Sequence, residues 1–229
     1  MNVEANISRV ASLFADPSRA SILRALMDGT RRPAGELAYA ANISAQSASA
    51  HLAKLVEGGL LAVESQGRHR YFRIASADVA HAIESLASLS VVVEPRAPAT
   101  LRPSRSTPIQ FLVSRTCYDH LAGEMAVRVL ERMLEVRWLI AEGRDFLVTR
   151  LGEKKLTALD VDLVTTRQSR RVFARACVDL TQRRPHLGGA LGAALFELYV
   201  ARGWILRARH SRVVSITPKG SEAFARLFG

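Results

Sequence analysis

Two short helical patterns meet at a tight polar turn near residue 43, and no other feature of the chain constrains its fold as much. The first pattern covers Pro33 to Ala41. Asn42-Ile43-Ser44 follows, and Ser44 is well placed to cap a second helix that extends to Glu57, because serine hydroxyls accept hydrogen bonds from the first amides of a helix. Two helices across so short a polar turn predict a helix-turn-helix.

The second helix has one apolar face and one small, polar face. Its apolar stripe contains Ala45, Ala48, Leu52, Leu55 and Val56. The other side carries Gln46, Ser47, Ala50 and Lys54, with Ser49 and His51 at its edges. Such side chains reach base edges and allow a close approach to the major groove, which makes this a candidate recognition helix. His51 fits a packing role equally well, because it borders the apolar stripe.

A predicted hairpin with a basic tip follows the candidate recognition helix. The runs "LLAVES", "QGRH" and "RYFRI" are typical of a strand, a turn and a strand, with Gly67 at the tip. Arg68, His69 and Arg70 surround this tip. Isolated surface charges are usually only solvated, but a basic hairpin after a small, polar helix predicts a wing that contacts DNA. Asp16-Pro17 starts an earlier helix and Ser76 a later one.

Three blocks, "LFADPSRASILRAL", "ISAQSASAHLAKLVEGGLL" and "ESQGRHRYFRI", together resemble the winged-helix repressors of the ArsR/SmtB family over about the first 90 residues. The resemblance is specific, because the blocks occur in the right order and at the right separations. It implies a homodimer bound to a palindromic operator in double-stranded DNA. It also implies nine DNA-binding residues: Ser44, Gln46, Ser47, Ser49, His51 and Lys54 at the recognition helix, and Arg68, His69 and Arg70 on the wing.

The chain departs from this family where some members bind metal ions. Metal-sensing members carry a Cys-x-Cys pair in the helix before the recognition helix, but that segment here reads "GELAYAANIS" and contains no sulfur. Asp78 and His81 are reminiscent of the family's other metal site, yet they lack the second histidine and the acid that would complete it, so an exposed helix face is the preferred interpretation. An effector is therefore expected to bind elsewhere.

The whole chain has a net charge of +11, and the positive charge is concentrated in its second half. Met1 to Val93 contains 9 basic and 8 acidic residues, and the remainder contains 23 basic and 13 acidic residues. Such an excess favours polyanionic partners. The Pro- and Arg-rich segment 94–108 cannot form a core and predicts a linker between a winged helix-turn-helix domain, residues 1–93, and a C-terminal domain, residues 109–229.

The C-terminal domain contains an internal repeat. "HLAGEMAVRVLERMLEVRWL" from His120 and "HLGGALGAALFELYVARGWI" from His186 share His-Leu-x-Gly, a glutamate and a tryptophan at a spacing of 66 residues. Each copy, about 117–165 and 177–229, is expected to form a helix that starts at the histidine, then a hairpin and a second helix, which Thr217 caps in the second copy. Neither first helix has a small polar face, so we expect two winged-helix-like units for sensing or assembly. The fold class is mainly α with small β-hairpins, that is, α+β.

The two cysteines each precede one of the repeated histidines, which makes Cys117, His120, Cys177 and His186 the candidate effector site. A soft metal or arsenite at Cys117 and Cys177 is one interpretation, oxidation is another, and a purely structural role is the third. The two cysteines do not occupy equivalent positions in the aligned copies. Cys117, Asp119 and His120 also provide the residue types of a thiol enzyme, but three residues on one predicted helical turn are not a nucleophile and base geometry.

Two cysteines do not form a disulfide framework, the N-terminal residues do not resemble a signal peptide, and no apolar run is long enough to span a membrane. These features predict a cytoplasmic protein with no membrane partner. The sequence as a whole predicts a sequence-specific transcriptional regulator, a repressor that an effector releases from DNA, and not an enzyme. An architectural DNA-binding protein without an effector is the alternative.

Overall fold

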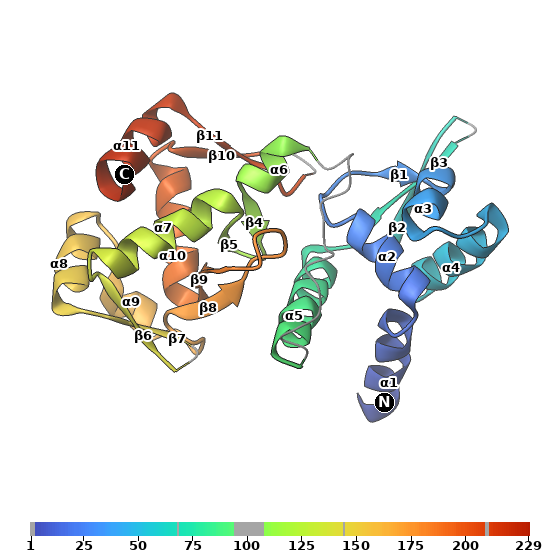
Figure 1. The fold of residues 1–229 in the computed structure, drawn as a ribbon, viewed down its shortest axis with the longest axis horizontal. Helices are drawn as coiled ribbons and strands as arrows, with labels where there is room; N and C mark the ends of the chain where they lie inside the picture. Colours follow the sequence, from blue (N-terminus) through green and yellow to red (C-terminus); the bar gives the residue numbers. More distant parts are fainter. Residues whose placement is uncertain (1–2, 68, 94–107, 144, 209–210) are drawn as a thin grey trace. The chain divides into compact units, whose positions relative to one another are not determined.

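The computed structural model describes residues 3–67, 69–93, 108–143, 145–208 and 211–229, which form two compact units, Met1–Ser85 and Leu86–Gly229 (Figure 1). The predicted linker, residues 94–108, lies outside the described residues except for Pro108. Within the described part of the chain, no helix is both long enough and apolar enough to cross a membrane.

The N-terminal unit has the element order expected of a winged helix. Its elements are α1 (Val3–Phe14), α2 (Pro17–Ala25), β1 (Arg32–Pro33), α3 (Ala34–Ala41), α4 (Ala45–Glu57), β2 (Leu61–Gln66), β3 (His69–Ile74) and α5 (Ala77–Val93), which extends beyond Ser85. The strands form one antiparallel sheet in the order β1-β3-β2. Sequence reasoning missed β1, which is only two residues long.

Local signals in the sequence explain the helix-turn-helix. The side chain of Asp16 accepts a hydrogen bond from the Arg19 amide at the start of α2, and that of Ser44 accepts one from the Ser47 amide at the start of α4. Asn42 ends α3 in a left-handed conformation, with φ of 52°, which asparagine adopts more readily than most residues. The core beneath the motif is formed by Ile22, Leu23, Leu26, Leu37, Leu52, Leu55, Leu60, Leu61 and Phe72. The predicted helix-turn-helix and wing hairpin are therefore confirmed.

The C-terminal unit contains the repeat in a form that differs from the predicted one. Its elements are α6 (Ile109–Val113), β4 (Arg115–Cys117), β5 (His120–Ala122), α7 (Glu124–Glu135), β6 (Leu139–Glu142), β7 (Asp145–Val148), α8 (Arg150–Ala158), α9 (Leu163–Arg167), β8 (Arg175–Val178), β9 (Pro185–Gly188), α10 (Gly189–Ala201), β10 (Ile205–Arg207), β11 (Val214–Ile216) and α11 (Pro218–Phe228). Each copy is thus a hairpin, a helix, a second hairpin and a second helix.

The expectation that His120 and His186 open helices is wrong. Both histidines lie in strands, and the helices start at Glu124 and Gly189. The shared glycine of His-Leu-x-Gly has positive φ in both copies, 94° at Gly123 and 75° at Gly189, a conformation that L side chains rarely adopt. This glycine turns the chain from a strand into a helix, and so the motif marks a strand-to-helix junction.

The two copies pack against each other through reciprocal contacts. Helix α7 of the first copy packs on β9 of the second, and α10 of the second packs on β5 of the first. Likewise, β8 pairs with β7 of the first copy, and β4 lies beside β11 of the second, where the Thr116 amide donates to the Arg212 carbonyl at 2.8 Å. The first hairpin of each copy therefore packs against the first helix and the second hairpin of the other copy.

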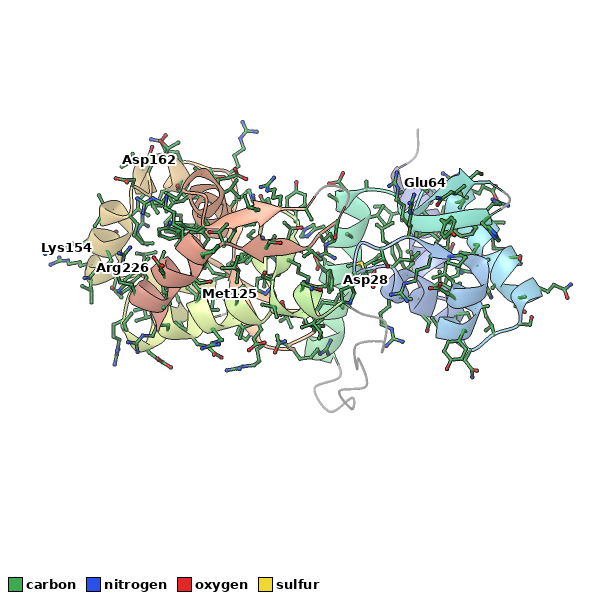
Figure 2. The ribbon with its side chains drawn as sticks, turned by 90° about the horizontal axis from the view of Figure 1, so that it is seen from above. Asp28, Glu64, Met125, Lys154, Asp162 and Arg226 are labelled. Carbon is green, nitrogen blue, oxygen red and sulfur yellow. The ribbon has the colours of Figure 1, made fainter. Side chains whose placement is uncertain are left out.

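One hydrophobic core serves both copies. Leu130 and Met133 of α7 join Leu191 and Phe196 of α10 in this core, and α10 is largely buried. Thr217 caps α11 as predicted by accepting a hydrogen bond from the Gly220 amide, and Thr149 caps α8 in the same way through the Gly152 amide. Lys154 on α8 is exposed to solvent, as Figure 2 shows.

Candidate nucleic-acid interface and candidate metal centre

Helix α4 presents to solvent the polar face expected of a recognition helix. Gln46, Ser47, Ser49 and Lys54 are exposed, whereas Ala48, Leu52 and Leu55 are buried on the opposite side. The Ser44 hydroxyl caps the helix, and the Ser49 hydroxyl donates to the Ala45 carbonyl at 3.0 Å. Within the described part of the chain, the side chains of Gln46 and Lys54 make no hydrogen bond, so both are available to a ligand.

His51 is half-buried and turned toward the start of α2. Its Nδ1 atom lies 3.8 Å from Oδ1 of Asp16, the residue that caps α2. This position supports the packing role that its place beside the apolar stripe left open. A direct contact of His51 with DNA remains a prediction.

The wing hairpin is formed by β2 and β3, whose register pairs Gln66 with His69 and Ser65 with Arg70. His69 and Arg70 are exposed, and Arg68 lies outside the described residues. Glu64, labelled in Figure 2, accepts hydrogen bonds from Arg73 at 2.6 Å and from Arg31 at 3.1 Å. These two hydrogen bonds, with the Arg73 bond the stronger effect, hold the pKa of Glu64 below its ordinary value.

The four predicted effector residues occupy equivalent positions in the two first hairpins, which lie side by side (Figure 1). Cys117 of β4 is the direct cross-strand partner of His120 of β5, and Cys177 of β8 is the partner of His186 of β9. The expectation that the cysteines are not equivalent is therefore wrong. A two-residue turn separates the first pair and eight residues separate the second, which hides the correspondence in the sequence.

The four side chains converge on one point in the interior. The Sγ atoms of Cys117 and Cys177 are 3.7 Å apart, and the Nε2 atoms of His120 and His186 are 3.2 Å apart. All four ligand atoms lie within 4.8 Å of one another. Both histidines and Cys117 are buried, and Cys177 is half-buried. In the described residues this is the one group of three or more such side chains that could hold a metal ion, and Asp78 and His81 form no second one.

A carboxylate stands behind each histidine. Nδ1 of His120 lies 3.3 Å from Oδ1 of Asp119, and Nδ1 of His186 lies 3.8 Å from Oδ2 of Asp179. Burial alone would lower the pKa of His120, but hydrogen bonds with Asp119 and Cys117 outweigh it and raise the pKa to about 9. Arg171 forms an ion pair with Asp119 on the solvent side.

Asp179 also anchors a fully buried ion pair that sequence reasoning missed. Its Oδ1 atom lies 2.7 Å from Nη2 of Arg115, and neither side chain is exposed to solvent. Its Oδ2 atom accepts a hydrogen bond from the Gly123 amide of the first copy at 2.7 Å. Burial opposes ionisation, but Arg115 and His186 hold the pKa of Asp179 well below its usual range. No local pattern indicates this role for Arg115, because Asp179 lies 64 positions away in the sequence.

The positions of Cys117 and His120 differ from the helical geometry considered for a thiol enzyme. Cys117 and His120 face each other across a hairpin and do not share a helical turn. Their ligand atoms point to the second Cys-His pair, inside a site built of two sulfur and two nitrogen atoms. This donor set is typical of metal coordination.

Several known proteins are similar to the N-terminal part of this chain. A family model described as a helix-turn-helix domain matches residues 14–64. The chain is 30% identical over 103 residues to the HTH-type transcriptional regulator CmtR of Mycobacterium bovis. The matched region covers 45% of this chain and 86% of CmtR. A solved homodimeric winged helix-turn-helix DNA-binding domain from Mycobacterium bovis, a possible ArsR-family transcriptional regulator, is 28% identical with a TM-score of 0.38 and covers 41% of this chain and 87% of that one.

One relative covers nearly the whole chain. It is the uncharacterized HTH-type transcriptional regulator YdfF of Bacillus subtilis, which is 42% identical over 221 residues that make up 96% of each protein. The similarity therefore includes the C-terminal unit with its two copies. This chain belongs to the family of HTH-type transcriptional regulators, which are DNA-binding proteins, and its N-terminal unit carries the winged helix-turn-helix that the ArsR/SmtB resemblance predicted.

Proposed function

We propose that this regulator is a repressor that binds a palindromic operator as a homodimer and is released from DNA by an effector at Cys117, His120, Cys177 and His186. The effector is a soft metal ion or a thiol-reactive species. We place the protein in the cytoplasm, where thiols are kept reduced and available.

The exposed face of α4 supports sequence-specific binding. Gln46 and Ser47 stand on the first turn of the helix, the part of a recognition helix that contacts base edges. Lys54 and the wing residues Arg68, His69 and Arg70 provide positive charge for the phosphates. Ser44 and Ser49 fit contacts near the backbone, where small hydroxyls donate to phosphate oxygens.

The observation that carries the effector site is the convergence of four ligand atoms within 4.8 Å. Thiolates and imidazoles prefer soft and borderline metal ions, and thiolates also react with arsenite and oxidants. Each copy of the repeat contributes one cysteine and one histidine, so a ligand bound here links the two copies. A ligand can change DNA affinity only if it binds one state of the protein better than another, and a link between two copies favours one arrangement of them.

A binding assay on DNA from upstream of the regulator's own gene tests this proposal. DNase footprinting of the reduced, chelator-treated protein should show a discrete palindrome, and added Zn²⁺, Cd²⁺, arsenite or peroxide should weaken binding by about 10-fold or more if the coupling is typical of allosteric proteins. Cys117→Ser/Cys177→Ser protein should bind DNA with normal affinity and should not respond. Lys154→Ala, on the surface of α8, is the matched control and should respond like the wild type.

Two results would contradict the proposal. Protection spread along the DNA without a palindrome would favour an architectural DNA-binding protein. Equal release of the wild type and the double cysteine variant would remove the effector role of the Cys-His cluster while leaving the DNA-binding assignment intact.

A further inference from the structure

We infer that Cys117, His120, Cys177 and His186 form a closed tetrahedral site for one Zn²⁺ ion, which fastens the two copies of the C-terminal unit to each other. This inference names the ligand class of the proposed effector site and rests on the proposed function only for its consequence at the DNA. Metal binding itself is a separate property of the chain.

The donor atoms select the class of ion. Two sulfur and two imidazole nitrogen donors are the ligand set of tetrahedral zinc sites, whereas magnesium and calcium require oxygen ligands. A reagent that reacts with thiols alone, such as arsenite, would engage Cys117 and Cys177 but leave the two imidazoles facing each other. Only an ion that binds both kinds of donor uses all four side chains.

The spacing of the donors matches a zinc tetrahedron. Ligands at the tetrahedral angle are separated by about 1.6 times the metal–ligand distance, which gives about 3.8 Å between two sulfurs and about 3.3 Å between two nitrogens around zinc. The corresponding distances here are 3.7 Å between the Sγ atoms and 3.2 Å between the Nε2 atoms. The sulfur-to-nitrogen pairs lie within 4.8 Å, so small side-chain movements complete the polyhedron.

The orientation of the two histidines also supports a metal ion between them. Nδ1 of His120 lies 3.3 Å from Oδ1 of Asp119, which favours the His120 tautomer with the proton on Nδ1. Nδ1 of His186 lies 3.8 Å from Oδ2 of Asp179, close enough for a charge interaction but beyond hydrogen-bond distance. The two Nε2 atoms face each other at 3.2 Å, within hydrogen-bond distance. A cation between them would displace the proton that they share and accept a lone pair from each nitrogen. A carboxylate behind each ligating histidine is the usual outer shell of zinc sites.

The backbone around the cluster leaves room for the imidazole pair. A Cβ atom at Gly188 would lie 3.1 Å from Nε2 of His120 and 3.4 Å from Cβ of Cys177, so the absence of a side chain at this position keeps the centre open. His186 is completely buried and His120 is 4% exposed. With four protein ligands and little access to solvent, the site has the closed coordination of structural zinc and no position for a substrate.

Metal analysis of the full-length protein, purified as expressed, tests the inference first. We expect one zinc per chain by elemental analysis. After removal of the zinc with a chelator, Co²⁺ as a spectroscopic probe should give the intense visible absorption of a tetrahedral site and a thiolate charge-transfer band, both displaced by one equivalent of Zn²⁺. Cys117→Ser, Cys177→Ser, His120→Gln and His186→Gln should each lose or alter these bands. His69→Gln, which changes an exposed wing histidine, should not.

The outer carboxylate provides a variant that keeps the four ligands. Asp119→Asn should lower the affinity for Zn²⁺ by about 10- to 100-fold, as loss of an outer-shell partner does in other zinc sites. Because Asp119 is partly exposed and sits at the tip of a hairpin, this variant should fold even if a buried ligand variant does not. Circular dichroism checks the folding of every variant.

Zinc binding with no effect on DNA would overturn the proposed effector role and support the inference. Release of DNA by a thiol-reactive agent from a protein that binds neither Zn²⁺ nor Co²⁺ would support the effector role and overturn the inferred zinc site. A Cys117–Cys177 disulfide in the purified protein, with no metal taken up after reduction, would also overturn the inference. So would Co²⁺ spectra of six-coordinate character, or unchanged zinc content in the ligand variants.

Discussion

Arg115 and Asp179 illustrate how single buried charges organise the C-terminal unit. The Asp179 carboxylate accepts hydrogen bonds from Arg115, from the Gly123 amide and from both the amide and the hydroxyl of Thr181. Arg115 in turn donates to the Phe111 carbonyl. A buried ion pair of this kind holds several segments in one arrangement, and it is costly to leave half of it unpaired.

Replacing Arg115 with alanine should therefore destabilise the C-terminal unit strongly. The expected loss is about 3–5 kcal/mol of unfolding free energy, because Asp179 would remain charged and buried without its partner. Both tryptophans of the chain, Trp138 and Trp204, lie in this unit, so urea denaturation followed by tryptophan fluorescence reports on it directly. Arg132→Ala, which removes an exposed pair with Glu135, should cost at most about 1 kcal/mol. A similar small loss for Arg115→Ala would refute the prediction.

Single residues of the N-terminal unit should separate base reading from phosphate binding. Gln46→Ala should change the ranking of operator variants, with a penalty of about 1–3 kcal/mol at one base pair, because Gln46 faces outward on the first turn of α4. Arg70→Ala should weaken binding to all sequences about equally. Fluorescence anisotropy with a panel of mutated operators measures both effects. A uniform loss for Gln46→Ala would remove it from the set of base-reading residues.

At the scale of elements, the strand-to-helix junctions decide how the copies are built. Gly123 and Gly189 both have positive φ, and a Cβ atom at Gly123 would lie 2.8 Å from the Val113 carbonyl oxygen. The repeated glycine is thus required by conformation and by close backbone contact. It is visible in the sequence, but its purpose is not, because a glycine before a helical pattern does not reveal a preceding strand.

Gly123→Ala should destabilise the C-terminal unit by about 1–3 kcal/mol, because alanine disfavours this backbone conformation and its methyl group would collide with the Val113 carbonyl. Gly35→Ala is the comparison, since Gly35 does not have positive φ and a methyl group there meets no atom within 4 Å. That variant should be neutral or slightly more stable. Thermal unfolding of both variants makes the measurement, and equal melting temperatures would count against the junction role.

At the scale of the whole molecule, much of the positive charge of the C-terminal unit is paired internally. Arg171 pairs with Asp119, Arg184 with Glu131 and Arg202 with Asp160. Arginines that looked like candidate polyanion contacts therefore hold segments of the unit together. The net charge of +11 already subtracts the acidic partners of these pairs, so pairing reduces the number of arginines available to DNA and leaves the net charge unchanged.

The salt dependence of DNA binding should consequently depend on the N-terminal unit. The logarithm of the binding constant should fall linearly with the logarithm of salt concentration, and Arg70→Ala should make the slope shallower by about one for each phosphate that the variant no longer neutralises. Arg184→Gln should leave the slope unchanged, since Arg184 is engaged with Glu131. Anisotropy titrations at several salt concentrations compare the three proteins. A shallower slope for Arg184→Gln would place the C-terminal unit at the DNA.

The amino-acid sequence by itself determined the elements whose signals are local. Asp16, Ser44 and Thr217 cap helices in the structure as their side chains predicted, and the spacing of apolar residues on α4 defined its buried and exposed faces. Caps and helical periodicity depend on residues within one or two turns, so one sequence is enough to recognise them.

Only the tertiary structure brings the two cysteines and the two histidines together in one cluster. The strands β4, β5 and β8 are three or four residues long, and the strands beside β4 and β8 belong in part to the other copy, so no local pattern identifies them. Cys117 and Cys177 became equivalent only when each was paired with its histidine across hairpins of different turn length. Contacts between residues 60 or more positions apart arise from the packing of two copies around one core, and this packing brought the four side chains together.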